Sequence, residues 1–133
     1  ASTTRTGAKA IKAIYQLICR GISPVTTPDG PSGPIYKFQP GAILLAQFTK
    51  APIIPMSYAA DKAWRLRTWD RFLIPKPFSR IRIVIGEPVY IREKLSMDEI
   101  KAKQLEMEGL MKTLYLQAQK DLATNPIQEN PQE

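Results

Sequence analysis

The sequence RIRIVIGEPVYI, residues 80–91, alternates apolar side chains with other side chains and is the clearest strand pattern in the chain. Over its first six residues, one face of this predicted strand is isoleucine. The other face carries arginines, which we expect to be solvated. The two faces are Ile81, Ile83 and Ile85 on one side and Arg80, Arg82 and Val84 on the other.

Helical and strand patterns extend from this stretch in both directions. Ser96 and Glu99 form a capping box that predicts the start of a long helix, and Asn125-Pro126 predicts its end. Gly21 stands where a left-handed C-terminal cap would close the first helix. Upstream of residue 80 the predicted elements are a helix over 6–20, a short strand over 22–27, a helix from Pro40 to about Lys50, and a strand over 52–60.

This order of elements predicts an α/β fold with a mainly parallel or mixed sheet flanked by helices. We expect residues 1–125 to be the C-terminal portion of such a domain, with its N-terminal part missing. Residues 126–133 form a polar, proline-broken tail that we expect to be disordered.

Composition limits the possible functions. The 133 residues carry a net charge of +7, which favours an anionic partner: nucleic acid, an anionic membrane surface or a phosphorylated small molecule. No apolar run is long enough to cross a bilayer. The chain has no histidine, so it lacks a histidine base and His-ligated zinc, and we expect no metal site. Cys19 is the single cysteine, which fits a reducing compartment.

The loop TPDGPSGP, residues 27–34, is the first candidate site. Its glycines would let a backbone approach a phosphate closely, and its prolines fix the turn before binding. Asp29 would then meet a hydroxyl group. The alternative is an ordinary turn in which Asp29 bonds its own backbone.

The segments TPDGPSGP, QPGAILLAQ, APIIPMS, WRLRTWDRFLIPKPFSR and GEP occur in that order. Together they resemble a bacterial branch of the lysophospholipid and glycerol-phosphate acyltransferase family, over most of residues 1–90. In that family a Pro-Glu-Gly-Thr loop helps bind the acyl acceptor, and Pro28, Asp29, Gly30 and Pro31 stand in its place. Residues 51–55, APIIP, match the family's proline-flanked strand.

The resemblance implies acyl transfer from a thioester donor, acyl-CoA or acyl carrier protein, to a lysophospholipid, glycerol-phosphate or lipid A-like acceptor, with no bound cofactor. The family's histidine-x4-aspartate block is absent from this chain, so no catalytic residue is expected here, and we expect the chain alone to be inactive. Ser32 replaces a residue that is more often basic. The implied acceptor-binding residues are Asp29, Gly30, Pro31, Ser32, Gly33, Arg5 and Lys37.

The segment 64–78 mixes aromatic and basic side chains, which is typical of a lipid headgroup boundary. The expected membrane contacts are Trp64, Arg65, Arg67, Trp69, Arg71 and Phe72. They predict a cytoplasmic protein that is peripheral on the inner face of the cell membrane. The tryptophans could instead pack on the sheet, and single-stranded nucleic acid is a weaker alternative because no RNA-binding signature accompanies the segment. The main alternative function is a non-catalytic basic module that binds anionic lipid or nucleic acid.

Overall fold

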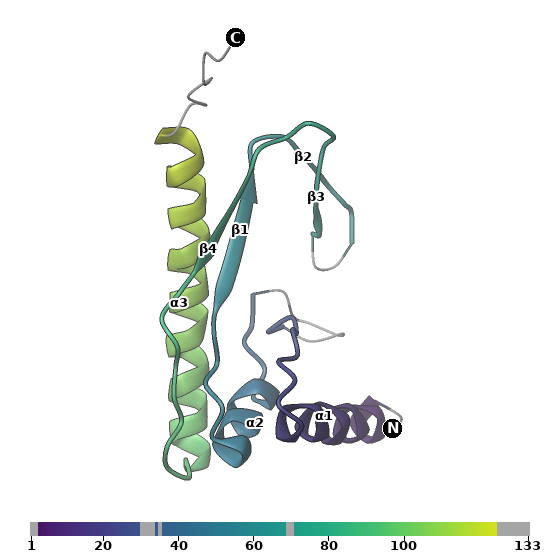
Figure 1. The fold of residues 1–133 in the computed structure, drawn as a ribbon, viewed down its shortest axis with the longest axis vertical. Coiled ribbons are helices and arrows are strands. Elements are labelled where there is room, and N and C mark those ends of the chain that lie inside the picture. The colour runs from purple at the N-terminus through teal and green to yellow at the C-terminus, as the bar shows by residue number, and fades with distance from the viewer. Residues whose placement is uncertain (1–2, 30–33, 35, 69–70, 125–133) are drawn as a thin grey trace. The chain divides into compact units, whose positions relative to one another are not determined.

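The computed structural model describes residues 3–29, 34, 36–68 and 71–124, with only the backbone of residues 3–6. It divides into two compact units, one of Ala1–Ile53 and Pro88–Glu108 and the other of Ile54–Glu87 and Gly109–Glu133. The elements, drawn in Figure 1, are α1 (Thr3–Cys19), α2 (Gly41–Thr49), β1 (Met56–Ala60), β2 (Ala63–Arg65), β3 (Leu73–Pro75), β4 (Ile81–Ile85) and α3 (Met97–Thr124). The first twelve residues of α3 belong to the first unit and the others to the second.

The first unit begins with α1, which contacts α2. Gly21 closes α1 with a φ of 79°, and the Ile22 N–H donates a hydrogen bond to the Leu17 carbonyl at 3.0 Å. This geometry confirms the predicted C-terminal cap, since glycine adopts a positive φ without steric cost. α2 follows Pro40, as predicted, and its apolar composition is explained by burial.

Apolar side chains from α2, α3 and the loops fill the core of the first unit. Gln47 is buried among them, and its side-chain oxygen accepts a hydrogen bond from the Leu95 N–H at 2.8 Å. That bond offsets the cost of burying an amide. The buried apolar residues of this unit are Phe38, Ile43, Leu45, Ala46, Ile91, Ile100 and Met107.

α3 begins at the predicted capping box. The Ser96 N–H donates to the Glu99 carboxylate at 2.6 Å, and the Glu99 N–H donates to the Ser96 hydroxyl at 3.3 Å. The hydrogen bonds from Ser96 lower the pKa of the Glu99 carboxyl. The helix continues to Thr124, the last residue described, so its predicted start is confirmed and its predicted stop at Asn125 lies outside the described residues.

The second unit contains two antiparallel two-stranded sheets. β1 pairs with β4 from Met56 opposite Ile85 to Ala60 opposite Ile81. β2 pairs with β3 as a separate hairpin between these two strands in the sequence. The second half of α3 lies alongside β1 and β4, as Figure 1 shows.

The predicted parallel or mixed sheet is therefore wrong for the residues described: each of the two sheets is antiparallel. Parallel neighbours need a long crossover, usually a helix, between the two strands. Here α1 and α2 precede β1 and α3 follows β4, so no helix connects one strand to the next. The chain between β1 and β4 instead folds into the β2–β3 hairpin.

Two further predictions need correction. Residues 22–27 form no strand, so the loop that follows does not sit at a strand's carboxyl end. The strand predicted over 80–91 spans only Ile81–Ile85, followed by a single bridge between Val89 and Ile53. Pro88 lacks the N–H that a continued ladder would use. The tail over 126–133 lies outside the described residues.

Candidate functional site

The loop that follows α1 is closed at its base by backbone hydrogen bonds. The Gln39 N–H donates to the Pro28 carbonyl at 2.7 Å, and the Lys37 N–H donates to the Pro34 carbonyl at 3.2 Å. The first bond joins the two ends of residues 28–39, which makes this segment a closed loop. Asp29 is half-buried just inside that closure.

The other predicted acceptor-binding residues are described in part. Gly30, Pro31, Ser32 and Gly33 lie outside the described residues. Arg5 lies in the first turns of α1, where only its backbone is described. Lys37 stands near the end of the loop. Asp29 and Lys37 are therefore the predicted binding residues of this loop whose side chains the structure describes.

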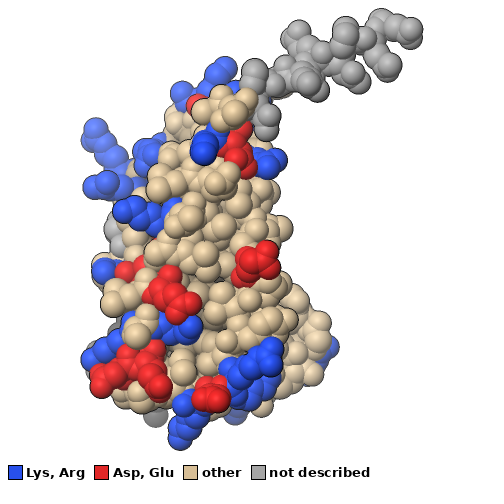
Figure 2. Space-filling model, turned by 90° about the vertical axis from the view of Figure 1, so that its left-hand side faces the viewer, with Lys and Arg blue, Asp and Glu red and all other residues tan. Residues whose placement is uncertain are grey.

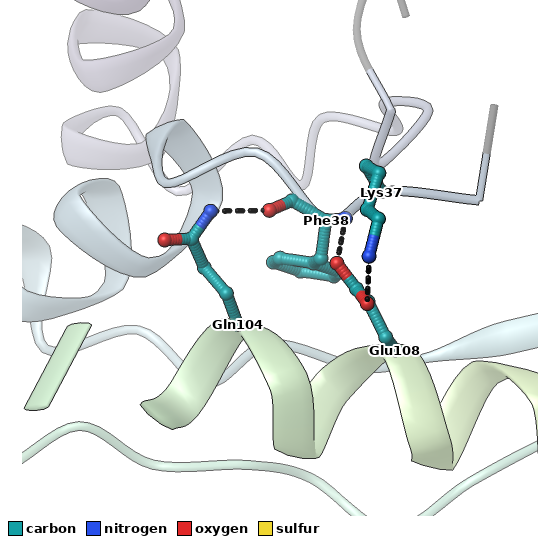
Figure 3. Close-up of polar contacts among 4 residues, drawn as sticks. All are labelled: Lys37, Phe38, Gln104 and Glu108. Atoms are coloured by element: carbon teal, nitrogen blue, oxygen red, sulfur yellow. Dashed lines mark hydrogen bonds and ion pairs between the residues drawn. The ribbon is translucent and has the colours of Figure 1, made fainter. Parts of the chain in front are cut away.

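Two side chains of α3 hold the end of this loop (Figure 3). The Glu108 carboxylate accepts a hydrogen bond from the Phe38 N–H at 3.0 Å, and the Gln104 amide donates to the Phe38 carbonyl. The Phe38 ring is buried beneath them. We call Gln104, Glu108 and Phe38 the loop anchor. The N–H and the carbonyl of Phe38 are both hydrogen-bonded to side chains of α3. The end of the loop therefore has one preferred position on the helix.

Lys37 joins this arrangement through its charge. Its ammonium lies 3.3 Å from the other oxygen of the Glu108 carboxylate (Figure 3). The lysine side chain is more than half exposed, so the ion pair contributes at most about 1 kcal/mol. A phosphate at this loop would therefore compete with Glu108 for Lys37, at a small cost.

The sequence predictions missed Gln104 and Glu108. The signal was present in α3, where positions 100, 104, 107, 111, 114 and 118 follow the spacing of an apolar face. Gln104 is the polar exception at one of these positions, and a polar group there needs a partner. The identity of that partner, the backbone of Phe38, depends on tertiary contact and has no local signal.

The predicted membrane-contact segment forms the β2–β3 hairpin and its flanks. Trp64 and Phe72 are about half exposed, and Arg65, Arg67 and Arg71 are exposed, while Trp69 lies outside the described residues. The Lys76 ammonium lies 5.8 Å from the centroid of the Trp64 ring, a cation–π distance. Trp64 is thus about half exposed and not part of the core.

Tyr58 ties this hairpin to β1. Its hydroxyl donates to the Leu73 carbonyl at 2.8 Å, and burial raises the pKa of Tyr58 above its ordinary value. The hairpin that carries the exposed aromatic and basic side chains is therefore hydrogen-bonded to β1.

The arginine of β4 and the arginine just before it each form an ion pair. Arg80 lies 3.0 Å from the Asp61 carboxylate and Arg82 lies 3.1 Å from the Asp121 carboxylate. The two arginines expected to be simply solvated are therefore held by carboxylates. On the face drawn in Figure 2, basic and acidic side chains are interspersed among uncharged ones. The net positive charge is not gathered into a single-sign patch among the residues described on that face.

Within the described part of the chain, no cluster of three or more His, Cys, Asp or Glu side chains could hold a metal ion. In the same residues, no helix has both the length and the apolar character needed to span a membrane.

Comparison with known proteins finds a relative of unknown function. An uncharacterized protein of Rickettsia prowazekii (strain Madrid E) is 33% identical to the chain over 113 residues. The match covers 85% of this chain and 50% of that protein, so the chain spans about half the length of this curated relative. No family model and no solved structure matches the chain.

Proposed function

We propose that the chain is the acceptor-binding part of an acyltransferase. The donor is an acyl thioester, acyl-CoA or acyl carrier protein. The acceptor is a hydroxyl of a lysophospholipid, glycerol-phosphate or lipid A-like molecule at a membrane surface. The proposal rests on the order of sequence segments that resemble this enzyme family. The observation that carries it is the loop over residues 28–39, whose ends are joined at 2.7 Å and whose end is held on α3 by two side chains.

Fixed loop ends suit the proposed role, because a segment whose ends are already held loses less conformational entropy when it binds a ligand. Asp29 would accept a hydrogen bond from the acceptor, and Lys37 would exchange Glu108 for the acceptor phosphate. In the reaction a base removes the hydroxyl proton, the oxygen attacks the thioester carbon, and the thiolate leaves. The 133 residues contain no histidine, so a histidine base would have to come from outside them.

The alternative is a non-catalytic module that binds anionic lipid. The exposed aromatic and basic side chains of the β2–β3 hairpin favour it, because rings of this kind settle at headgroup depth and cations attract anionic lipid. The same hairpin would also bring an acyltransferase to its membrane, on the inner face of the cell membrane. Membrane binding alone therefore does not separate the two functions.

The test is acceptor use by the whole protein that contains these residues, measured with a thioester donor and a lysophospholipid. Asp29→Asn should lower kcat/KM for the acceptor by about ten- to a hundredfold, because it weakens a charge-assisted hydrogen bond worth ~1.5–3 kcal/mol. Asp98→Asn, an exposed change in the first turn of α3, is the matched control and should retain full activity. The melting temperature of each variant separates lost binding from lost folding.

Two outcomes oppose the proposal. Unchanged kcat/KM in Asp29→Asn makes the loop an ordinary turn. Absence of any acyl transfer, together with flotation on anionic but not neutral vesicles that salt reverses, favours the lipid-binding module.

A further inference from the structure

The β1–β4 sheet exposes a continuous apolar face. Met56, Ile81, Ile83 and Ile85 are 46%, 52%, 59% and 66% exposed. The register places Met56 opposite Ile85, so these side chains share one face of the sheet. We call these four residues the isoleucine face.

The opposite face of the same sheet is the one that α3 covers. Ala59 is 4% exposed on that face, and the Arg82 guanidinium reaches the α3 carboxylate of Asp121 at 3.1 Å. At the end of β4, a Cβ placed on Gly86 would lie 3.1 Å from a Leu114 methyl group, so backbone and helix are in close contact there. α3 therefore packs on the face that holds Arg82, and the isoleucines point away from the helix.

This arrangement reverses the usual order of a half-covered antiparallel sheet, in which polar residues face outward. Here the outward face is the more apolar one. The six outward positions of the two strands, Met56, Tyr58, Ala60, Ile81, Ile83 and Ile85, include no charged residue. A contiguous exposed apolar surface of this kind marks an interaction site.

We propose that in the whole protein the isoleucine face is covered by polypeptide equivalent to the half of the Rickettsia relative that lies outside the match. The 113 matched residues make up 50% of that relative, so a similar number of residues remains outside the match to pack against it. A second copy of the chain fits less well, because a net charge of +7 opposes self-association. A lipid surface fits less well too, because the six outward positions of β1 and β4 carry no cation.

Cysteine labelling in the whole protein tests this proposal. In a Cys19→Ser background, Ile83→Cys is compared with Lys112→Cys, an exposed position on α3 in the same unit. Maleimide should label position 83 at least tenfold more slowly than position 112 in the native protein, and at the same rate in denaturant. Ile85→Cys provides a second probe of the face if Ile83→Cys fails to fold.

Equal native labelling at positions 83 and 112 overturns the proposal. Protection that disappears on dilution identifies a second copy as the occupant, and protection that requires added vesicles identifies lipid. Either of these results also overturns it. The labelling does not depend on acyl transfer, so it stands or falls separately from the proposed function.

Discussion

Removing the carboxylate of Glu108 tests whether the loop anchor holds the candidate site. Glu108→Ala deletes the acceptor of the Phe38 N–H bond at 3.0 Å and the partner of Lys37 at 3.3 Å. A hydrogen bond to a charged group contributes ~1.5–3 kcal/mol. The exposed ion pair adds at most ~1 kcal/mol, and we expect a total loss of about 1.5–4 kcal/mol of unfolding free energy. Glu108→Gln keeps a carbonyl acceptor for the amide and should lose about 1 kcal/mol or less.

Urea denaturation of the three proteins measures these differences, and amide hydrogen exchange reports directly on the Phe38 N–H. Glu106→Ala is the matched control, because Glu106 lies on the same helix but is paired only with Lys103 on the exposed side. It should change stability by less than about 0.5 kcal/mol. A Glu108→Ala variant that stays within this range, or a Gln variant as unstable as the Ala variant, would refute the anchoring argument.

Two further predictions concern the second unit. The hydrogen bonds from Arg80 lower the pKa of Asp61 below its ordinary 3.8. The ionised carboxylate therefore stabilises the folded chain above pH 3.8, and this stabilisation is lost as the pH falls through the lowered pKa of Asp61. Asp61→Asn should therefore weaken the dependence of urea stability on pH below 3.8; an unchanged acid profile contradicts the pairing. Gly86→Val should cost about 1–3 kcal/mol, because a Cβ at Gly86 already lies 3.0 Å from Pro55 and 3.1 Å from Leu114. Gly109→Ala, with open space around it on α3, should instead stabilise the protein by about 0.5–1 kcal/mol. Thermal unfolding measures both variants, and a shift of the same sign for Gly86→Val and Gly109→Ala would contradict the close packing at Gly86.

Local signals predicted the helices well because their causes are local. The capping box at Ser96 and the glycine cap at Gly21 each involve residues within a few positions of one another. Strand pairing is different, because it joins residues far apart in the sequence. Ser57 pairs with Val84, and nothing in either strand indicates direction or partner. The parallel sheet was inferred from element order, and the hairpin between β1 and β4 removed the crossover that this inference needed.

In the candidate site, too, the local feature was predictable and the long-range contact was not. Proline and glycine content identified the loop, since those residues restrict the backbone locally. The anchor was missed because Glu108 lies about 70 positions from Phe38 in the sequence, although Gln104 was visible as a polar residue in an apolar stripe.

The isoleucine face shows what periodicity can and cannot establish. Alternation in β4 predicted correctly that Ile81, Ile83 and Ile85 share a face, because side chains in a strand alternate regardless of context. It could not predict which face α3 would cover, since burial depends on the partner that each face meets. Arg82 can lie on the face next to α3 because it stays about half exposed and pairs with Asp121 there, while the isoleucines have no such partner and remain open to another segment. The ion pair thus makes the less apolar face compatible with packing on α3, and the apolar face is the one we expect the remaining polypeptide to cover.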